Sequence, residues 1–148
     1  MIIAFTGHSF IASKNKIKSL VKEQIKNNIT DKEPITCYLG GYGDFDEICA
    51  IACVELKKEF TNIEIAYITP YVSLTEQVKS ENAIYDVIIY PPLENVLPKF
   101  AISKRNEWMM TNADLVIAYV NCDYGGAYKT LQIAKRKNKK IINISDFL

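Results

Sequence analysis

The feature that most constrains this fold is an alternation of short apolar runs with segments of helical period. Ile2–Thr6, Ile63–Thr69 and Leu115–Val120 are predominantly apolar, as expected of strands buried on both faces of a sheet. Neighbouring parallel strands need long crossover connections, and helices supply them. The pattern therefore predicts an α/β fold, a three-layer Rossmann-like sandwich with a mostly parallel sheet of five or six strands. The remaining predicted strands are Thr36–Leu39, Asp86–Tyr90 and Ile141–Ile144.

Segments of helical character between these runs predict the helices. The clearest is Lys14–Asn28, in which apolar residues recur at helical spacing. Asp44 can cap a helix that runs to about Phe60. Pro98 can open a helix at its first turn, and that helix continues over Phe100–Asn112. Further helices are predicted from Gly125-Gly126 to about Asn138 and, on a weaker pattern, within 71–85.

The composition suits one ordinary domain. Of the 148 residues, 49% are apolar and 24% charged, and no linker-like stretch divides them, so we expect a single domain over 1–148. No apolar run is long enough to span a bilayer and the start lacks a basic leader, so we expect a cytoplasmic protein without a membrane partner. The cysteines lack metal-binding spacing and there is one histidine, so we expect neither a metal site nor a cofactor. Cys49 and Cys53 are predicted to be small buried side chains.

Charge is nearly balanced along this chain. There are 18 Lys and Arg against 17 Asp and Glu, for a net charge of +1. Such a chain has no overall field to attract a polyanion. The one basic cluster, Lys135–Lys137 with Lys139 and Lys140, is more typical of a solvated helix end. We therefore do not expect a nucleic-acid partner.

Loops that contain glycine follow three of the predicted strands. They are Thr6-Gly7-His8-Ser9, Gly40-Gly41-Tyr42-Gly43 and Tyr124-Gly125-Gly126. In an open parallel sheet, ligands bind beyond the carboxyl ends of the strands, where such loops gather. Glycine permits positive φ angles and lets a ligand approach backbone N–H groups, which can bind phosphate. Each glycine can also serve only to turn the chain, but three at one edge favour a binding site.

The helices after the second and third of these loops begin differently. The acidic first turn of the earlier helix contains Asp44, Asp46 and Glu47. These carboxylates would repel phosphate and suit ribose hydroxyls or a base. The later helix has no acid in its first turn, and Lys129 and Thr130 follow, so we place a phosphate at the Gly125-Gly126 loop. Alternatively, the acids are ordinary helix-start charges and Lys129 is a solvated surface lysine.

Arg105 and His8 can complete such a pocket, together with Thr6 and Gly7. Arg105 lies among apolar residues at helical spacing, which places it on a buried face or at its margin. Its guanidinium suits a phosphate or carboxylate partner, although an isolated arginine is often only a solvated charge. His8 can bind a ligand or act as a structural hydrogen-bonding group. Phosphate-loop, dinucleotide-fingerprint and serine-hydrolase motifs are absent from the sequence.

Five short motifs stand in a fixed order along the chain. They are F-T-G-H at the end of the first strand, G-G-Y-G-D-F-D before a helix, Pro70-Tyr71, Arg105-Asn106 followed by Met109 and Asp114, and Gly125-Gly126 with Lys129-Thr130. Together they resemble the SLOG superfamily, the Rossmann-like group that joins the DNA-processing protein DprA with the LOG cytokinin-activating enzymes. Within it, the chain looks most like the small stand-alone proteins of Gram-positive bacteria typified by YpsA.

The resemblance implies a pocket for a nucleotide or a nucleotide-derived molecule, often in a homodimer. In the LOG branch, R-K-x-x-M and G-G-x-G-T-x-x-E motifs serve hydrolysis of the N-glycosidic bond of a nucleoside monophosphate. Arg105 and Met109 match the first motif, whereas Tyr128 stands at the third glycine of the second and Gln132 at its glutamate. Glutamine cannot act as a general base, so this departure counts against LOG-type hydrolysis.

The leading hypothesis is a domain that binds a nucleotide or nucleotide-derived small molecule, such as an ADP-ribose-type signal, in a homo-oligomer. The alternative is an enzyme that cleaves N-glycosidic bonds of nucleoside monophosphates, a phosphoribohydrolase, with Asp46, Glu47 and Arg105 as catalytic candidates. The expected ligand-binding residues are Thr6, Gly7, His8, Gly41, Gly43, Asp44, Asp46, Arg105, Gly125, Gly126, Lys129 and Thr130.

Overall fold

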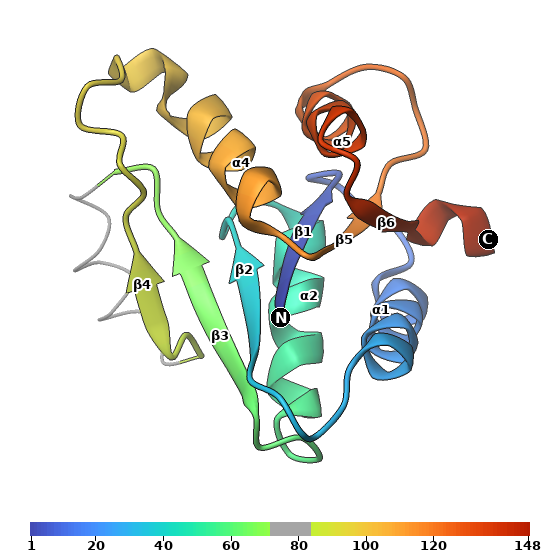
Figure 1. The fold of residues 1–148 in the computed structure, drawn as a ribbon. Helices are drawn as coiled ribbons and strands as arrows, with labels where there is room; N and C mark the ends of the chain where they lie inside the picture. The colour runs from blue at the N-terminus through green and yellow to red at the C-terminus, as the bar shows by residue number, and fades with distance from the viewer. Residues whose placement is uncertain (72–83) are drawn as a thin grey trace.

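A computed structural model describes residues 1–71 and 84–148 of the chain. Six strands form one sheet in the order β4-β3-β2-β1-β5-β6, and every neighbouring pair is parallel (Figure 1). The strands are β1 (Ile2–Gly7), β2 (Ile35–Leu39), β3 (Ile63–Ile68), β4 (Val87–Ile89), β5 (Leu115–Tyr119) and β6 (Lys140–Asn143). The strand order reverses direction between β1 and β5, which creates the crevice in which open α/β sheets bind ligands.

Helices cover both faces of this sheet. Within the described residues they are α1 (Lys14–Asn28), α2 (Asp44–Leu56), α4 (Ala101–Asn112) and α5 (Gly126–Arg136), with short 3-10 turns η1 (Pro98–Phe100) and η2 (Ile144–Phe147). Figure 1 shows α1 and α2 on one face and α4 and α5 on the other. Alternate residues of β1 reach the two layers, since Ile3 and Phe5 belong to the core under α1 and α2, and Ala4 to the core under α4 and α5. The predicted three-layer Rossmann-like fold is confirmed.

The loops that follow β1, β2 and β5 lie close together at the carboxyl edge of the sheet. Gly7 ends β1 directly against α2, where an added Cβ would lie 2.4 Å from Cδ2 of Phe45. A side chain at this position would therefore force the helix away from the strand. On the other side of β1, the His8 N–H donates to the Tyr119 carbonyl at the end of β5 (3.3 Å). The β1–α1 loop thus lies between the loops that follow β2 and β5.

Most predicted boundaries are correct within a few residues, and the exceptions have local causes. The structure confirms Lys14–Asn28 as a helix, but α2 ends at Leu56, because the Lys58 and Glu59 N–H groups donate to carbonyls only three residues earlier (3.3 and 3.0 Å) and the regular helical series stops. The last helix stops at Arg136 because Asn138 has a φ of 57°, which a right-handed helix cannot contain. The short helix predicted within 71–85 falls on residues 72–83, which lie outside the described residues.

Asp44 does not cap α2, contrary to the prediction from sequence. The capping position is Gly43, with a φ of 89° and no side-chain hydrogen bond. The Asp44 carboxylate instead accepts the Ile11 N–H across the β1–α1 loop (2.8 Å). Asp44, at the first position of α2, thus holds the β1–α1 loop through this hydrogen bond.

Three further observations concern the buried cysteines, the membrane and metal binding. Cys49 and Cys53 are buried among apolar side chains of α2, as predicted. No described helix combines the length and the apolar character that crossing a membrane requires. Within residues 1–71 and 84–148, no group of three or more His, Cys, Asp and Glu side chains is arranged to hold a metal ion.

Candidate functional site

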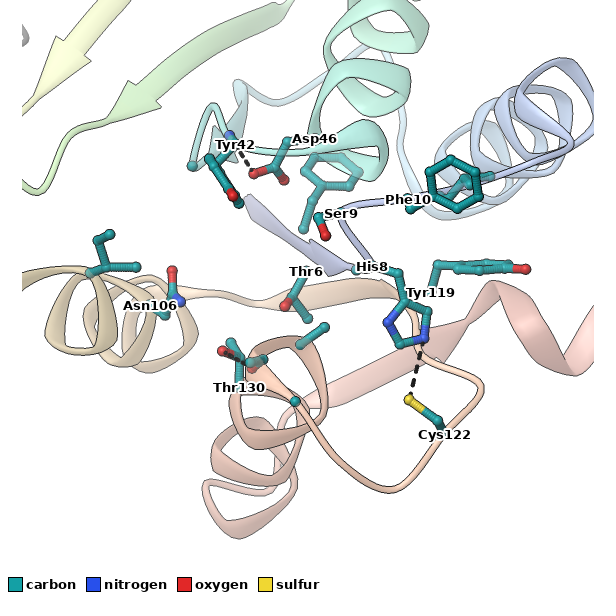
Figure 2. Close-up of a pocket in the computed structure, with 18 of the residues that line it drawn as sticks. Thr6, His8, Ser9, Phe10, Tyr42, Asp46, Asn106, Tyr119, Cys122 and Thr130 are labelled. Atoms are coloured by element: carbon teal, nitrogen blue, oxygen red, sulfur yellow. Dashed lines mark hydrogen bonds between the residues drawn. The ribbon is translucent and has the colours of Figure 1, made fainter.

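A cavity of about 730 Å³ opens at the carboxyl edge of the sheet, where β1 and β5 lie side by side. Its volume falls in the range of small-molecule sites. Figure 2 shows its wall, to which the loops after β1, β2 and β5 and the facing ends of α4 and α5 contribute. The lining residues are Phe5, Thr6, Gly7, His8, Ser9, Phe10, Ile11, Ala12, Gly40, Tyr42, Asp46, Ile102, Arg105, Asn106, Met109, Tyr119, Asn121, Cys122, Tyr124, Gly125, Gly126, Ala127 and Thr130.

The N-terminus of α2 is occupied by the protein's own chain. The Asp44 N–H donates to the Ser9 carbonyl (3.0 Å), and the Phe45 N–H donates to the His8 carbonyl (3.3 Å). These are donors that a helix N-terminus otherwise offers to an anion. Because they are used and the first turn is acidic, this helix end is closed to phosphate.

The glycines that precede α2 serve close packing. Gly41 has a φ of 71°, and a Cβ there would lie 2.1 Å from Cε2 of Tyr67. Gly43 has a φ of 89°, and a Cβ there would lie 2.7 Å from the backbone Cα of Ser9. Neither glycine lines the cavity, and both allow the chain to pass a neighbour at a distance that no side chain permits.

The N-terminus of α5 is open toward the cavity. Gly125 has a φ of 93° and precedes a first turn with no acidic residue and no side-chain cap. A Cβ at Gly125 or Gly126 would have no heavy atom within 4 Å, and both glycines line the cavity. The first N–H groups of a helix have no partner within the helix, and the helix dipole adds positive potential there. This end can accept an anionic group.

Helical phase separates two residues that sequence analysis grouped together. Thr130 lines the cavity and is buried, with its hydroxyl donating to the Gly126 carbonyl (2.9 Å). Lys129 is exposed and is not among the lining residues, since consecutive residues of a helix point about 100° apart. The ammonium therefore belongs to the outer surface of α5, and the anion-binding capacity of this end lies in the backbone.

Arg105 is buried on α4, on the side that its apolar neighbours indicated. The residue is 4% exposed, and its Nη1 donates to the carbonyls of Gly40 (3.0 Å) and Ile68 (2.7 Å). Its Nε donates to Oδ1 of Asn106 (2.8 Å). Burial lowers the pKa of the guanidinium, and the nearby carboxylate of Asp46 opposes that shift. Arg105 thus joins the ends of β2 and β3 to α4 and forms part of the cavity wall.

Asp46 provides the acidic group of the cavity. Desolvation raises the pKa of its carboxyl to about 6, although the Tyr42 N–H (3.1 Å) and the charge of Arg105 both act to lower it. A carboxyl with this pKa can hold or release a proton near neutral pH. The neighbouring Glu47 is exposed and does not line the cavity, so only one of the two acids proposed as catalytic candidates reaches it.

His8 fastens two of the loops. The Asn121 N–H donates to its Nε2 (3.0 Å), and the Cys122 Sγ lies 3.9 Å from the same nitrogen, as the dashed line in Figure 2 marks. The ring also packs edge-on against Tyr119, with centroids 5.7 Å apart. These contacts hold the β1–α1 loop against the β5–α5 loop and keep the imidazole at the cavity wall.

Of the twelve expected ligand-binding residues, eight line the cavity, and four (Gly41, Gly43, Asp44 and Lys129) do not. Sequence analysis did not single out the side chains of Phe10, Tyr42, Tyr124, Asn106 and Cys122, which also line it. A signal for Tyr42 and Tyr124 was present, because each stands beside glycine in a loop after a strand. Asn106 appeared only as part of the Arg105-Asn106 motif, and Cys122 had no signal, since its position depends on the path of the loop between β5 and α5.

Comparison with known proteins identifies the fold. No protein-family model matches the chain, and no curated protein matches it in sequence. DprA from Streptococcus pneumoniae is similar in structure, with a TM-score of 0.63 and 13% identity over 94% of this chain and 48% of that one. DprA from Helicobacter pylori gives a TM-score of 0.61 and 16% identity over 100% of this chain and 71% of that one. The chain thus spans about half the length of the Streptococcus protein, and it shares a fold with both.

These similarities support one sequence-based expectation and overturn another. The similar structures are DprA proteins, which belong to the SLOG group that the motifs resembled. The expectation that nucleic acid is not a partner is wrong as stated, because the Helicobacter pylori DprA has a described single-stranded DNA binding mode. That expectation rested on the balanced net charge and on the lack of a concentrated basic face. Backbone amides and aromatic rings can bind a strand without a large basic field, so balanced charge does not exclude such a partner.

Proposed function

We propose that this protein binds a nucleotide-type ligand in the cavity, with a phosphate group at the N-terminus of α5. The open first turn of this helix, which begins at Gly126 on the cavity wall, is the observation that carries the proposal. Backbone N–H groups and the helix dipole suit a phosphate, and Gly126 adds no side chain to block its approach.

The remainder of the wall suits the sugar and base of such a ligand. Thr6, Asn106 and Thr130 lie around one space in Figure 2 and bring polar groups to it. Asp46 lies across from them and can accept hydrogen bonds from ribose hydroxyls or from a base. A small number of polar groups among apolar ones is the usual make-up of a small-molecule site.

Two other functions have a specific observation in their favour. The fold similarity to a single-stranded DNA-binding DprA favours a nucleic-acid strand as the source of the nucleotide unit. The carboxyl of Asp46, whose pKa of about 6 suits proton transfer, favours the enzymatic alternative, cleavage of an N-glycosidic bond. Both use the same cavity and the same phosphate position.

Isothermal titration calorimetry tests the proposal by measuring the affinities of AMP, ADP-ribose, adenosine and inorganic phosphate. We expect AMP and ADP-ribose to bind and adenosine to bind at least about tenfold more weakly, because it lacks the phosphate. Chromatography of the same mixtures separates binding from turnover, since free adenine would show cleavage and intact AMP would show binding alone. Equal affinity for AMP and adenosine would contradict a phosphate site.

Three further expectations remain predictions. The resemblance suggested a homodimer and a particular closeness to the YpsA-type proteins, and the lack of a bilayer-spanning run and of a basic leader suggested a cytoplasmic location. The single domain expected over 1–148 is also a proposal, and one cooperative unfolding transition by two different probes would support it.

A further inference from the structure

Three aromatic side chains stand exposed around the mouth of the cavity. Phe10 is 81% exposed, Tyr42 78% and Tyr124 74%. They come from three different loops, after β1, β2 and β5, and all three line the same cavity. Single exposed apolar residues are common on proteins, but a group of large rings gathered at one opening marks a binding surface.

Hydrogen bonds hold the backbone beside Phe10 and Tyr42 in place, although the two rings are exposed. The Tyr42 N–H donates to the Asp46 carboxylate (3.1 Å). Beside Phe10, the Ser9 carbonyl accepts the Asp44 N–H (3.0 Å) and the Ile11 N–H donates to the Asp44 carboxylate (2.8 Å). A ring on a fixed backbone has only two torsions to lose when a ligand covers it, so binding carries a small entropic cost.

Tyr124 is presented in a similar way. Its carbonyl accepts a hydrogen bond from the Cys122 Sγ (3.4 Å), and this cysteine lies against His8 of the neighbouring loop. The third ring therefore also stands on a loop that is tied to the rest of the rim. We call Phe10, Tyr42 and Tyr124 together the aromatic rim.

The charge of the cavity favours flat, uncharged ligand groups at this rim. Among the described residues that line it, Asp46 and Arg105 are the only Asp, Glu, Lys or Arg side chains, and the Arg105 guanidinium already donates to three acceptors within the protein. Within residues 1–71 and 84–148, no lysine lines the cavity to attract a run of phosphates. Nucleobases stack on aromatic side chains, and stacking tolerates any base because every base has a π-face.

The spacing of the rim calls for more than one base. Figure 2 shows Tyr42 and Phe10 on opposite sides of Ser9, so one base cannot cover both rings. The N-terminal end of α5 also lines the cavity, and Tyr124 directly precedes its Gly125-Gly126 turn. A ligand that reaches both rings and this helix end therefore needs two bases and a phosphate.

From this arrangement we infer that the ligand carries two nucleobases joined through phosphate, one stacked on Tyr42 and the other on Phe10. The inference rests on the proposed function, because it assumes the phosphate at the N-terminus of α5. A free dinucleotide and two adjacent residues of a single strand share this chemistry.

The test compares dAMP, a 5′-phosphorylated deoxyadenylate dinucleotide and a short poly-deoxyadenylate strand by isothermal titration. We expect the dinucleotide to bind about tenfold more tightly than dAMP, since each stacked base contributes about 1–3 kcal/mol and 1.4 kcal/mol is a factor of ten. Phe10→Ala and Tyr42→Ala should each lower dinucleotide affinity about tenfold or more, and the double variant should bind the dinucleotide no better than wild-type protein binds dAMP. Phe147→Ala is the matched control, because this ring is 51% exposed but does not line the cavity, and its affinities should equal those of the wild type.

The outcomes separate this inference from the proposed function. If wild-type protein binds dAMP and the dinucleotide equally, or if the rim variants bind as the wild type does, the two-base inference is wrong and the phosphate site stands. If neither dAMP nor the dinucleotide binds, both proposals fail. A strand that binds more tightly than the dinucleotide, after correction for its number of sites, identifies the source as single-stranded nucleic acid. Equal affinity identifies a free dinucleotide.

Salt dependence provides a second readout. Raising salt from about 50 to about 200 mM should weaken dinucleotide binding only about threefold, because the cavity pairs about one phosphate and counterion release scales with that number. A loss of about a hundredfold or more would show that charge, and not stacking, holds the ligand, and would overturn the inference.

Discussion

The N-termini of α2 and α5 begin with nearly the same backbone geometry and differ in what fills them. Gly43 precedes α2 with φ 89° and ψ 173°, and Gly125 precedes α5 with φ 93° and ψ 176°. The amides of α2 donate to the carbonyls of His8 and Ser9, whereas the end of α5 has neither a side-chain cap nor an acid. A glycine turn before a helix is therefore not a ligand site by itself, because its free donors decide its chemistry.

The comparison also separates two uses of glycine. At Gly43 a close backbone neighbour occupies the space that a side chain would need, so the residue is required by the fold. At Gly125 and Gly126 that space is open and belongs to the cavity. Substitutions at the two loops should therefore separate stability from binding, and the predictions below run from the largest expected loss of stability to the smallest.

Gly43→Ala should destabilise the protein most, by about 4 kcal/mol, because it combines an unfavourable φ with a Cβ 2.7 Å from the Ser9 backbone. Gly125→Ala is the matched control. It has the same φ strain without a neighbour within 4 Å and should cost about 2 kcal/mol. Urea denaturation of both variants measures the two losses. Equal losses would contradict the view that the first loop is closed by packing and the second is open.

Arg105→Ala should cost about 3 kcal/mol of unfolding free energy, because the Gly40 and Ile68 carbonyls lose a charged donor in a buried place. Lys104→Ala, next to it on α4, removes only an exposed pair with Glu107 (3.3 Å) and should change stability by less than about 0.5 kcal/mol. Thermal unfolding compares them. A binding defect in Arg105→Ala at unchanged stability would instead make the guanidinium a ligand-binding group.

Asp46→Asn should change the pH dependence of the free energy of unfolding. The difference between wild type and variant should vary by on the order of 2 kcal/mol between low and neutral pH. The pKa of this carboxyl is raised to about 6 in the folded protein from its usual 3.8, so the folded state holds the proton more tightly than the unfolded state. Stability from this group is therefore present at low pH and is lost as the pH rises through about 6.

Unfolding free energies at several pH values between about 4 and about 7 test this expectation for wild-type protein and Asp46→Asn. The difference, wild type minus variant, should fall as the pH rises. Glu55 and Asp86, whose pKa values are lowered mainly by lysine partners, act in the opposite direction at lower pH and cancel in this comparison. A difference that does not change with pH would show that the Asp46 carboxyl has an ordinary pKa.

Local pattern was enough to predict the layers and many of the residues that line the cavity. Apolar runs and helical spacing predicted the strands and the Lys14–Asn28 helix, because each signal lies within a few consecutive residues. The sequence also showed acidic residues at the start of α2 and none at the start of α5, which is the difference on which the proposed phosphate position rests. The burial of Arg105 followed from its apolar neighbours in the helix.

The remainder depends on contacts between distant segments, which a single sequence does not encode locally. The sequence predicts Asp44 as a helix cap. In the structure, the β1–α1 loop lies close to Asp44, and the Asp44 carboxylate accepts the Ile11 N–H instead. Lys129 and Thr130 are adjacent in sequence, and only the rotation of α5 on the sheet decides which one faces the cavity. The exposure of Phe10 likewise follows from the path of a loop.

Gly126→Val tests the central claim most directly, and it should have the smallest effect on stability. An added Cβ there meets no heavy atom within 4 Å and lies in the first turn of α5, so we expect AMP affinity to fall at least about tenfold while the free energy of unfolding changes by less than about 0.5 kcal/mol. Isothermal titration of AMP into wild type and variant, with urea denaturation of the same samples, decides the matter. Unchanged AMP affinity in a stably folded Gly126→Val protein would contradict a phosphate site at this helix end.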